Sequence, residues 1–202
     1  MTITLNGTTG ITTPALDSVA PFSSADMPAG SVLQVVVGHK KDTTALSPTG
    51  GVQAIPNLAA TITPKSSSSK ILVQMNITSA SSSGSSQARL WLLYRNGSNI
   101  TDAMATQVGT SPVAWVKTSG TLGMSSTGSF NPDHGMGVDS GAYLDSPNST
   151  SALTYQVYCQ PQSNAGINIL INRNGSDQTD QGPNAQWEAR STSTIILMEI
   201  AG

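Results

Sequence analysis

The sequence predicts an all-β fold: an antiparallel β-sandwich or jelly-roll-like head preceded by an extended N-terminal arm. Charged residues make up only 10% of the 202-residue chain, against about a quarter in an ordinary globular domain. Ser, Thr, Asn, Gln and 19 Gly take their place, and these residues disfavour helix interiors and suit turns and strands. No window places apolar residues at a helical spacing over several turns, whereas short apolar runs between turn residues recur along the chain.

The first part of the chain, Met1–Ala29, holds short apolar islands separated by Gly, Thr and Pro. Such islands cannot fill a core by themselves, but they can lie along another protein surface as an extended arm. A flexible terminus is the alternative interpretation. We therefore expect a docking arm over 1–29 and a head domain over 30–202. The residues expected to dock are Ile3, Leu5, Ile11 and Leu16.

Within the head, an alternation of period two marks the strands, because successive side chains of a strand point to opposite faces. Asn96-Gly97 is a strong hairpin signal, because both residues tolerate a positive φ. Pro56 is expected to break one extended segment into two short pieces. The expected strands, in chain order, are Ser31–His39, the two pieces of Val52–Pro64, Lys70–Thr78, Gln87–Arg95, Gly141–Leu144, Ala152–Gln160 and Ser191–Gly202.

Two of these strands, Gln87–Arg95 and Ser191–Gly202, are apolar on both faces. A strand with one solvent-exposed face alternates apolar and polar residues. Both faces of these two strands should therefore be buried against other protein. One face can meet the core and the other a neighbouring subunit. We therefore expect a subunit interface, at Leu90, Trp91, Leu93, Ile195 and Leu197.

Residues 108–140 are dense in Gly and hold isolated apolar side chains. Long surface loops are expected there, and loops often carry the residues that bind ligands. Exposed aromatic side chains offer flat apolar rings on which a sugar can stack. The candidate receptor-binding residues are Trp115, Phe130, His134 and Tyr143.

Residues of the common catalytic and metal sites are scarce. The chain has two His and a single Cys, so it offers neither an intrachain disulfide nor a His/Cys set with zinc spacing. Cys159 lies on the apolar face of an expected strand and should be a buried, unreactive thiol. Asp139 and Asp145 form the one acidic pair near a loop region, and glycoside hydrolysis needs such a pair. A weaker candidate set, for Ca²⁺, is Asn174, Asp177 and Asp180.

These candidate residues are too isolated in the sequence to predict a catalytic or metal-binding site. We therefore expect no enzyme, no metal and no cofactor. A net charge of −2 argues against nucleic acid as a partner, because phosphate binding needs concentrated Lys and Arg. The N-terminal residues lack the basic start and long apolar core of a signal peptide. No apolar run approaches the roughly 20 residues of a membrane helix, so no membrane insertion is expected.

Six stretches carry a family resemblance. They are TITLNGTTGITTP, PAGSVLQVVVG, ITPKSSSSKILVQMNI, LYRNGSNI, YLDSPNSTSALTYQVY and RSTSTIILMEIAG. Together they resemble a family of small tail-fibre-like virion structural proteins from phages of marine and cyanobacterial hosts. The resemblance covers most of the chain, and its motifs are structural. It implies a component of the virion, assembled in the host cytoplasm and most often part of a fibre or tail.

The resemblance further implies a homotrimer, because fibre heads commonly close around a threefold axis. The expected partners are further copies of the chain, another virion protein that receives the arm, and a host surface glycan bound by the loops. A long fibre is not expected, because the chain has no repeated shaft. A capsid decoration protein is the alternative, and a glycan-degrading enzyme is the least favoured one.

Overall fold

The computed structural model describes residues 4–6, 10–12, 26–47, 51–82, 88–101, 116–118, 135–162, 168–175 and 189–202. Across these ranges the chain is built from strands, and no α-helix occurs. The prediction of an all-β fold is therefore confirmed. In the same ranges, no helix has the length and apolar character needed to span a membrane.

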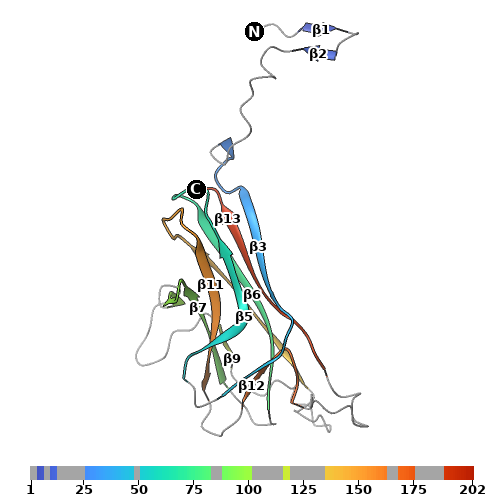
Figure 1. The fold of residues 1–202 in the computed structure, drawn as a ribbon, viewed down its shortest axis with the longest axis vertical. Coiled ribbons are helices and arrows are strands. Elements are labelled where there is room, and N and C mark those ends of the chain that lie inside the picture. The colour runs from blue at the N-terminus through green and yellow to red at the C-terminus, as the bar shows by residue number, and fades with distance from the viewer. Residues whose placement is uncertain are drawn as a thin grey trace.

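The strands form two larger antiparallel sheets (Figure 1). The first has the order β3-β13-β6-β12-β4, with β10 also paired to β6. The second has the order β5-β11-β7-β8, with β9 also paired to β7. The first sheet comprises β3 (Val32–Lys40), β4 (Thr44–Leu46), β6 (Lys70–Ser81), β10 (Gly137–Asp145), β12 (Ile169–Ile171) and β13 (Ser193–Ile200). The second comprises β5 (Gln53–Ile62), β7 (Ala88–Arg95), β8 (Ser98–Asn99), β9 (Val116–Thr118) and β11 (Leu153–Gln162).

One hydrophobic core lies between the two sheets, and both contribute alternate side chains to it. The alternation expected in the sequence is confirmed in β6 and β11. The inward side chains of these two strands are Ile71, Val73, Met75, Ile77, Leu153, Tyr155, Val157 and Cys159. Burial raises the pKa of the Cys159 thiol to about 12, so it is the inert buried thiol that its position predicted.

The expected hairpin at Asn96-Gly97 joins β7 to β8. Both turn residues have a positive φ, 49° for Asn96 and 79° for Gly97, as a type I′ turn requires. The Asn96 side chain also accepts a hydrogen bond of 2.8 Å from the backbone N–H of Thr154. The turn therefore also fixes the start of β11.

Pro56 does not break its segment into two strands, contrary to expectation. β5 runs through it as one strand at the edge of the second sheet. Its pairing with β11 shifts register between Gln156 and Tyr158, and Asn57 has a φ of 62°. A bulge at an edge strand tolerates proline, because the missing N–H faces no ladder partner.

The two sheets approach each other most closely where β3 passes β5. A Cβ atom on Gly38 would overlap the backbone carbonyl of Ala59 in β5 and would lie 2.8 Å from Cγ2 of Ile195. Only a residue without a side chain fits between the two strands. Gly38 therefore fixes the distance between the sheets along this side of the core.

The head begins beside the C-terminal end of the chain (Figure 1). The N–H of Gly30 donates to the carbonyl of Ala201, and the N–H of Ala201 donates to Ser31, both at 2.8 Å. Of the expected docking arm, the structure describes a two-stranded pairing of β1 (Thr4–Asn6) with β2 (Gly10–Thr12), in which Leu5 is opposite Ile11. Ile3 and Leu16 lie outside the described residues.

The subunit interface predicted from the two-sided strands is wrong. Its five residues are Leu90, Trp91, Leu93, Ile195 and Leu197, and each has no exposed surface within a single chain. All except Leu90 belong to the core cluster between the sheets. A side chain that is already fully buried has no area left to bury against a second subunit.

Candidate functional site

The closing strand β13 has one buried and one partly exposed face. Ile195, Leu197 and Glu199 point into the core, whereas Ile196, Met198 and Ile200 keep part of their surface in contact with solvent. The sequence placed Ile195 and Leu197 in a subunit interface, so the exposed face of β13 is the opposite of the expected one. Ordinary antiparallel sheets carry polar residues on such a face, so its three large apolar residues need an explanation.

Apolar residues of neighbouring strands continue this face in register. Met198 pairs with Val35 of β3 on one side and with Leu72 of β6 on the other, and Leu72 pairs in turn with Leu144 of β10. The next row along the strands consists of Val37, Ile196, Gln74 and Ala142. We call these two rows, which cross β3, β13, β6 and β10, the outer sheet face.

The outer sheet face is bounded by rows of a different character. Toward one end stand Val32, Ile200 and Lys70, and toward the other stand His39, Thr194, Asn76 and Ser140. Across the two rows of the face and the two that bound it, the side chains change from apolar to polar along the strands, and none of these four rows holds a carboxylate. The two rows of the outer sheet face, four strands wide, cover about 260 Å², just below the range of the largest apolar patches of typical monomers.

The apolar side chains at both edges of this face are well exposed. Relative exposure is 53% for Val35, 55% for Val37 and 46% for Leu144. Single exposed apolar residues are common on protein surfaces, but a contiguous, register-matched group of them is typical of a binding surface. A shallow hollow of about 330 Å³ opens on the same face between β6 and β10, beside Gln74 and Ala142.

The one carboxylate on the inward side of β13, Glu199, is fully buried and serves the fold. It accepts hydrogen bonds of 2.6 Å from Gln34 Nε2 and from the backbone N–H of Lys65. Burial alone would raise its pKa, but the hydrogen bonds from Gln34 and the backbone outweigh burial and lower it. Glu199 therefore anchors the turn that precedes β6 to the end of the closing strand.

Replacement of Glu199 by glutamine is expected to lower the free energy of unfolding by about 2–3 kcal/mol at pH 7, because charge-assisted hydrogen bonds are lost. The folded-state pKa lies below the unfolded one, so this contribution is present above the unfolded pKa. It is lost as the pH falls through the folded pKa. Urea unfolding at pH 7 and pH 3 should show a deficit that shrinks in acid. Lys65→Ala, which keeps the backbone donor, should be near neutral, and an equal deficit at both pH values would contradict the role of Glu199.

Asp139 and Asp145 are likewise buried in strand β10 and bind the second sheet. Asp139 accepts a hydrogen bond of 2.8 Å from Trp91 Nε1. Asp145 accepts one of 2.6 Å from Arg95 and one of 2.7 Å from the Tyr155 hydroxyl. Six residues of strand separate the two carboxylates by about 20 Å, and a glycosidase pair needs about 5–9.5 Å. They cannot form the catalytic pair that the sequence left open.

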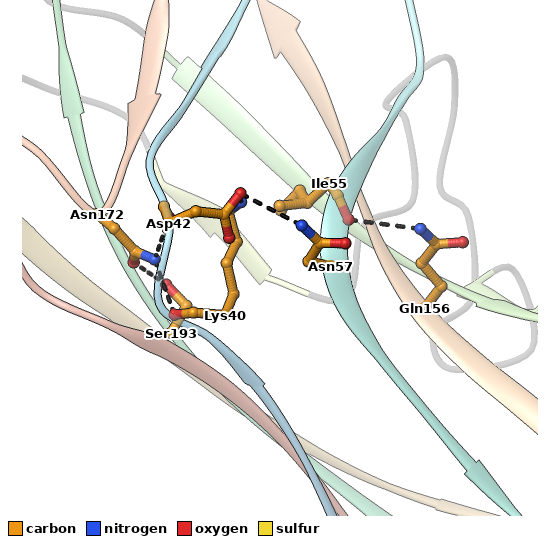
Figure 2. A network of polar contacts seen from close by, with 7 residues as sticks. All are labelled: Lys40, Asp42, Ile55, Asn57, Gln156, Asn172 and Ser193. Carbon is orange, nitrogen blue, oxygen red and sulfur yellow. Dashed lines mark hydrogen bonds and ion pairs between the residues drawn. The ribbon is translucent and has the colours of Figure 1, made fainter.

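A further polar network ties the end of β3 to β12 and β13 (Figure 2). Asn172 donates hydrogen bonds of 3.0 Å to the carbonyls of Lys40 and Asp42, and its oxygen accepts one of 2.6 Å from Ser193. The buried ammonium of Lys40 lies 2.9 Å from the Asp42 carboxylate and lowers the pKa of Asp42. Asn57 in β5 donates to the same carboxylate at 3.3 Å. The network joins both sheets through these contacts.

The predicted receptor residues do not form a site in the described part of the chain. Trp115, Phe130 and His134 lie outside it. Tyr143 belongs to strand β10 rather than to a loop, and it packs against the core. The expected strand Gly141–Leu144 already contained Tyr143, and β10 extends it at both ends, from Gly137 to Asp145.

Metal ligands are not gathered in the described ranges either: no three of His, Cys, Asp and Glu lie close together there. Asp177 and Asp180 lie outside these ranges. Asn174 is buried, and its side-chain oxygen accepts a hydrogen bond of 3.4 Å from the N–H of Ala189. Asn174 thus has a structural contact of its own.

Sequence reasoning missed the outer sheet face, although part of its signal is visible. Val35 and Val37 alternate with the inward residues of β3, and Ile196 and Met198 do the same in β13. The sequence does not show that these strands are neighbours or that Leu144 completes the row. No family model matches this chain, and no curated protein matches it.

Proposed function

We propose that the chain is a structural protein of a phage particle, a short homotrimeric fibre-like component that its N-terminal arm attaches to another virion protein. The observation that carries the proposal is the outer sheet face, an uncharged and mostly apolar surface four strands wide. Such a face suits contact with other protein, because contiguous exposed apolar patches mark interaction sites.

The interior of the head supports the same proposal. The buried carboxylates of Asp139, Asp145 and Glu199 all accept hydrogen bonds or hold partners within the fold. Charged side chains that are buried and paired stabilise one arrangement of strands and leave little chemistry at the surface. Together with the resemblance of six stretches to small virion proteins, this favours an architectural role over a catalytic one.

The direct test is the number of copies in purified particles of the encoding phage, measured by quantitative mass spectrometry against the major capsid protein. A fibre component should be present as a small multiple of three per particle. A number set by the lattice of the head would instead support the alternative, a capsid decoration protein. Absence of the protein from purified particles would contradict both.

Deletion of Met1–Ala29 is expected to leave a folded head that no longer joins the particle. The hydrogen bonds between Gly30, Ser31 and Ala201 close the head at the residue that follows the arm, so the deletion removes no strand of the two larger sheets. Circular dichroism should show the β spectrum of the full chain, and complementation should yield particles without the truncated protein. Incorporation at the normal copy number would rule out docking through the arm.

A further inference from the structure

On the basis of the homotrimer proposed above, we infer that the outer sheet face is its threefold interface: three copies place this face toward a common axis that runs along the strands. The occupant of the face is thus the same face of two further copies of this chain. This replaces the interface residues expected from the sequence, which are all buried within one chain.

The charge of the face favours a second copy over a different partner. Its two central rows contain no ionisable side chain, so identical faces meet without repulsion. Lys70 is the one Lys or Arg in the four rows. It stands in the end row, where its ammonium can stay in water. A partner recognised by charge would need a complementary charge at the centre of the face, and the face has none.

The polarity gradient of the face determines the direction of the axis. Apolar rows lie toward Val32 and polar rows toward His39. An axis parallel to the strands brings each row against the same row of the other copies, so apolar side chains meet apolar ones and amides meet hydroxyls. An axis in the plane of the face but perpendicular to the strands would instead set the apolar end of one copy against the polar end of the next, at a cost in desolvation.

The width of the face fits three copies. Four strands at a spacing of about 4.8 Å span about 19 Å. The centre of an equilateral triangle with sides of that length lies about 5 Å from each side, which is half of the roughly 10 Å between packed sheets. One layer of side chains from each copy therefore fills the space around the axis. At the corners, β3 of one copy lies beside β10 of the next, so the exposed Val35 and Leu144 are both covered.

The first test is the mass in solution, by light scattering after size exclusion at micromolar concentration. The full chain should have three times its mass of 20.8 kDa. Val37→Lys and Leu144→Lys should each have the mass of one chain, because each puts a lysine without a partner into the contact between β3 of one copy and β10 of the next. Val52, which is 42% exposed and lies outside the face, supplies the matched control, and Val52→Lys should remain a trimer. Circular dichroism checks that each variant is folded.

A second test does not depend on disrupting the assembly. In a Val35→Cys, Leu144→Cys double variant, each new thiol should lie beside its counterpart on the next copy, because both residues stand in one row. Oxidation should give a covalent trimer on a denaturing gel, whereas either single variant should stay uncrosslinked. The native Cys159 is buried and should not interfere.

Several outcomes would overturn the inference: a full chain that is not a trimer, lysine variants that keep the trimer mass, or a double variant that gives only covalent dimers. The first would also overturn the homotrimer of the proposed function, whereas the other two concern the interface alone. None of them changes the copy number in particles. The proposed place in a virion therefore stands or falls separately, by the mass spectrometry described above.

Discussion

Substitution of Gly38 by alanine is expected to lower the free energy of unfolding by about 3 kcal/mol or more, the upper end of overpacking effects. The added methyl group would overlap the Ala59 carbonyl in β5 and press on Ile195. Backbone cannot swing aside as a flexible side chain can, so β3 and β5 would have to separate. Urea unfolding followed by circular dichroism measures the loss.

Gly51→Ala is the comparison for this variant. Gly51 has a φ of 61° and nothing near the position of a Cβ. Its substitution should cost about 1–2 kcal/mol, for the left-handed conformation alone. If the Gly38→Ala protein were as stable as the Gly51→Ala protein, the close contact between β3 and β5 would not hold the two sheets at a fixed distance.

Asn172→Ala is expected to cost about 2–5 kcal/mol, because two buried groups and one part-buried group each lose a hydrogen bond at once, and an unsatisfied buried group costs about 1–3 kcal/mol. These groups are the carbonyls of Lys40 and Asp42 and the hydroxyl of Ser193 (Figure 2). Asn172 also has a φ of 61°, a conformation that asparagine tolerates better than alanine. Thermal and urea unfolding should both show the loss.

Asn148→Ala separates the cost of losing asparagine at a positive φ from the cost of losing the hydrogen bonds of Asn172. Asn148 has a similarly positive φ of 49° but is exposed, so its substitution should cost only the conformational part, about 1 kcal/mol. The difference between the two variants measures the buried hydrogen bonds of Asn172. Equal losses would show that these bonds contribute nothing to the stability of the head.

The sequence by itself determined the elements that depend on local pattern. Alternation in Lys70–Thr78 and Ala152–Gln160 predicted both the strands and their inward faces, because one face of each is almost wholly apolar. Asn96-Gly97 predicted its hairpin, since few other residue pairs adopt two consecutive positive φ values. The inert state of Cys159 followed from its place in such a strand. In all of these cases the neighbouring residues in the chain decide the outcome.

Tertiary structure alone decided which face of β13 is the inside. Both faces are apolar, so their composition does not choose between them, and Glu199 suggests that its own face is the exposed one. Instead Glu199 is buried, because Gln34 and the backbone of Lys65 come from distant parts of the chain to bind its carboxylate. Ile196 and Met198 are thereby turned outward, where they line up with Val35 and Leu144. The candidate interface depends on strand neighbours far apart in sequence, and the pattern within any one strand cannot specify them.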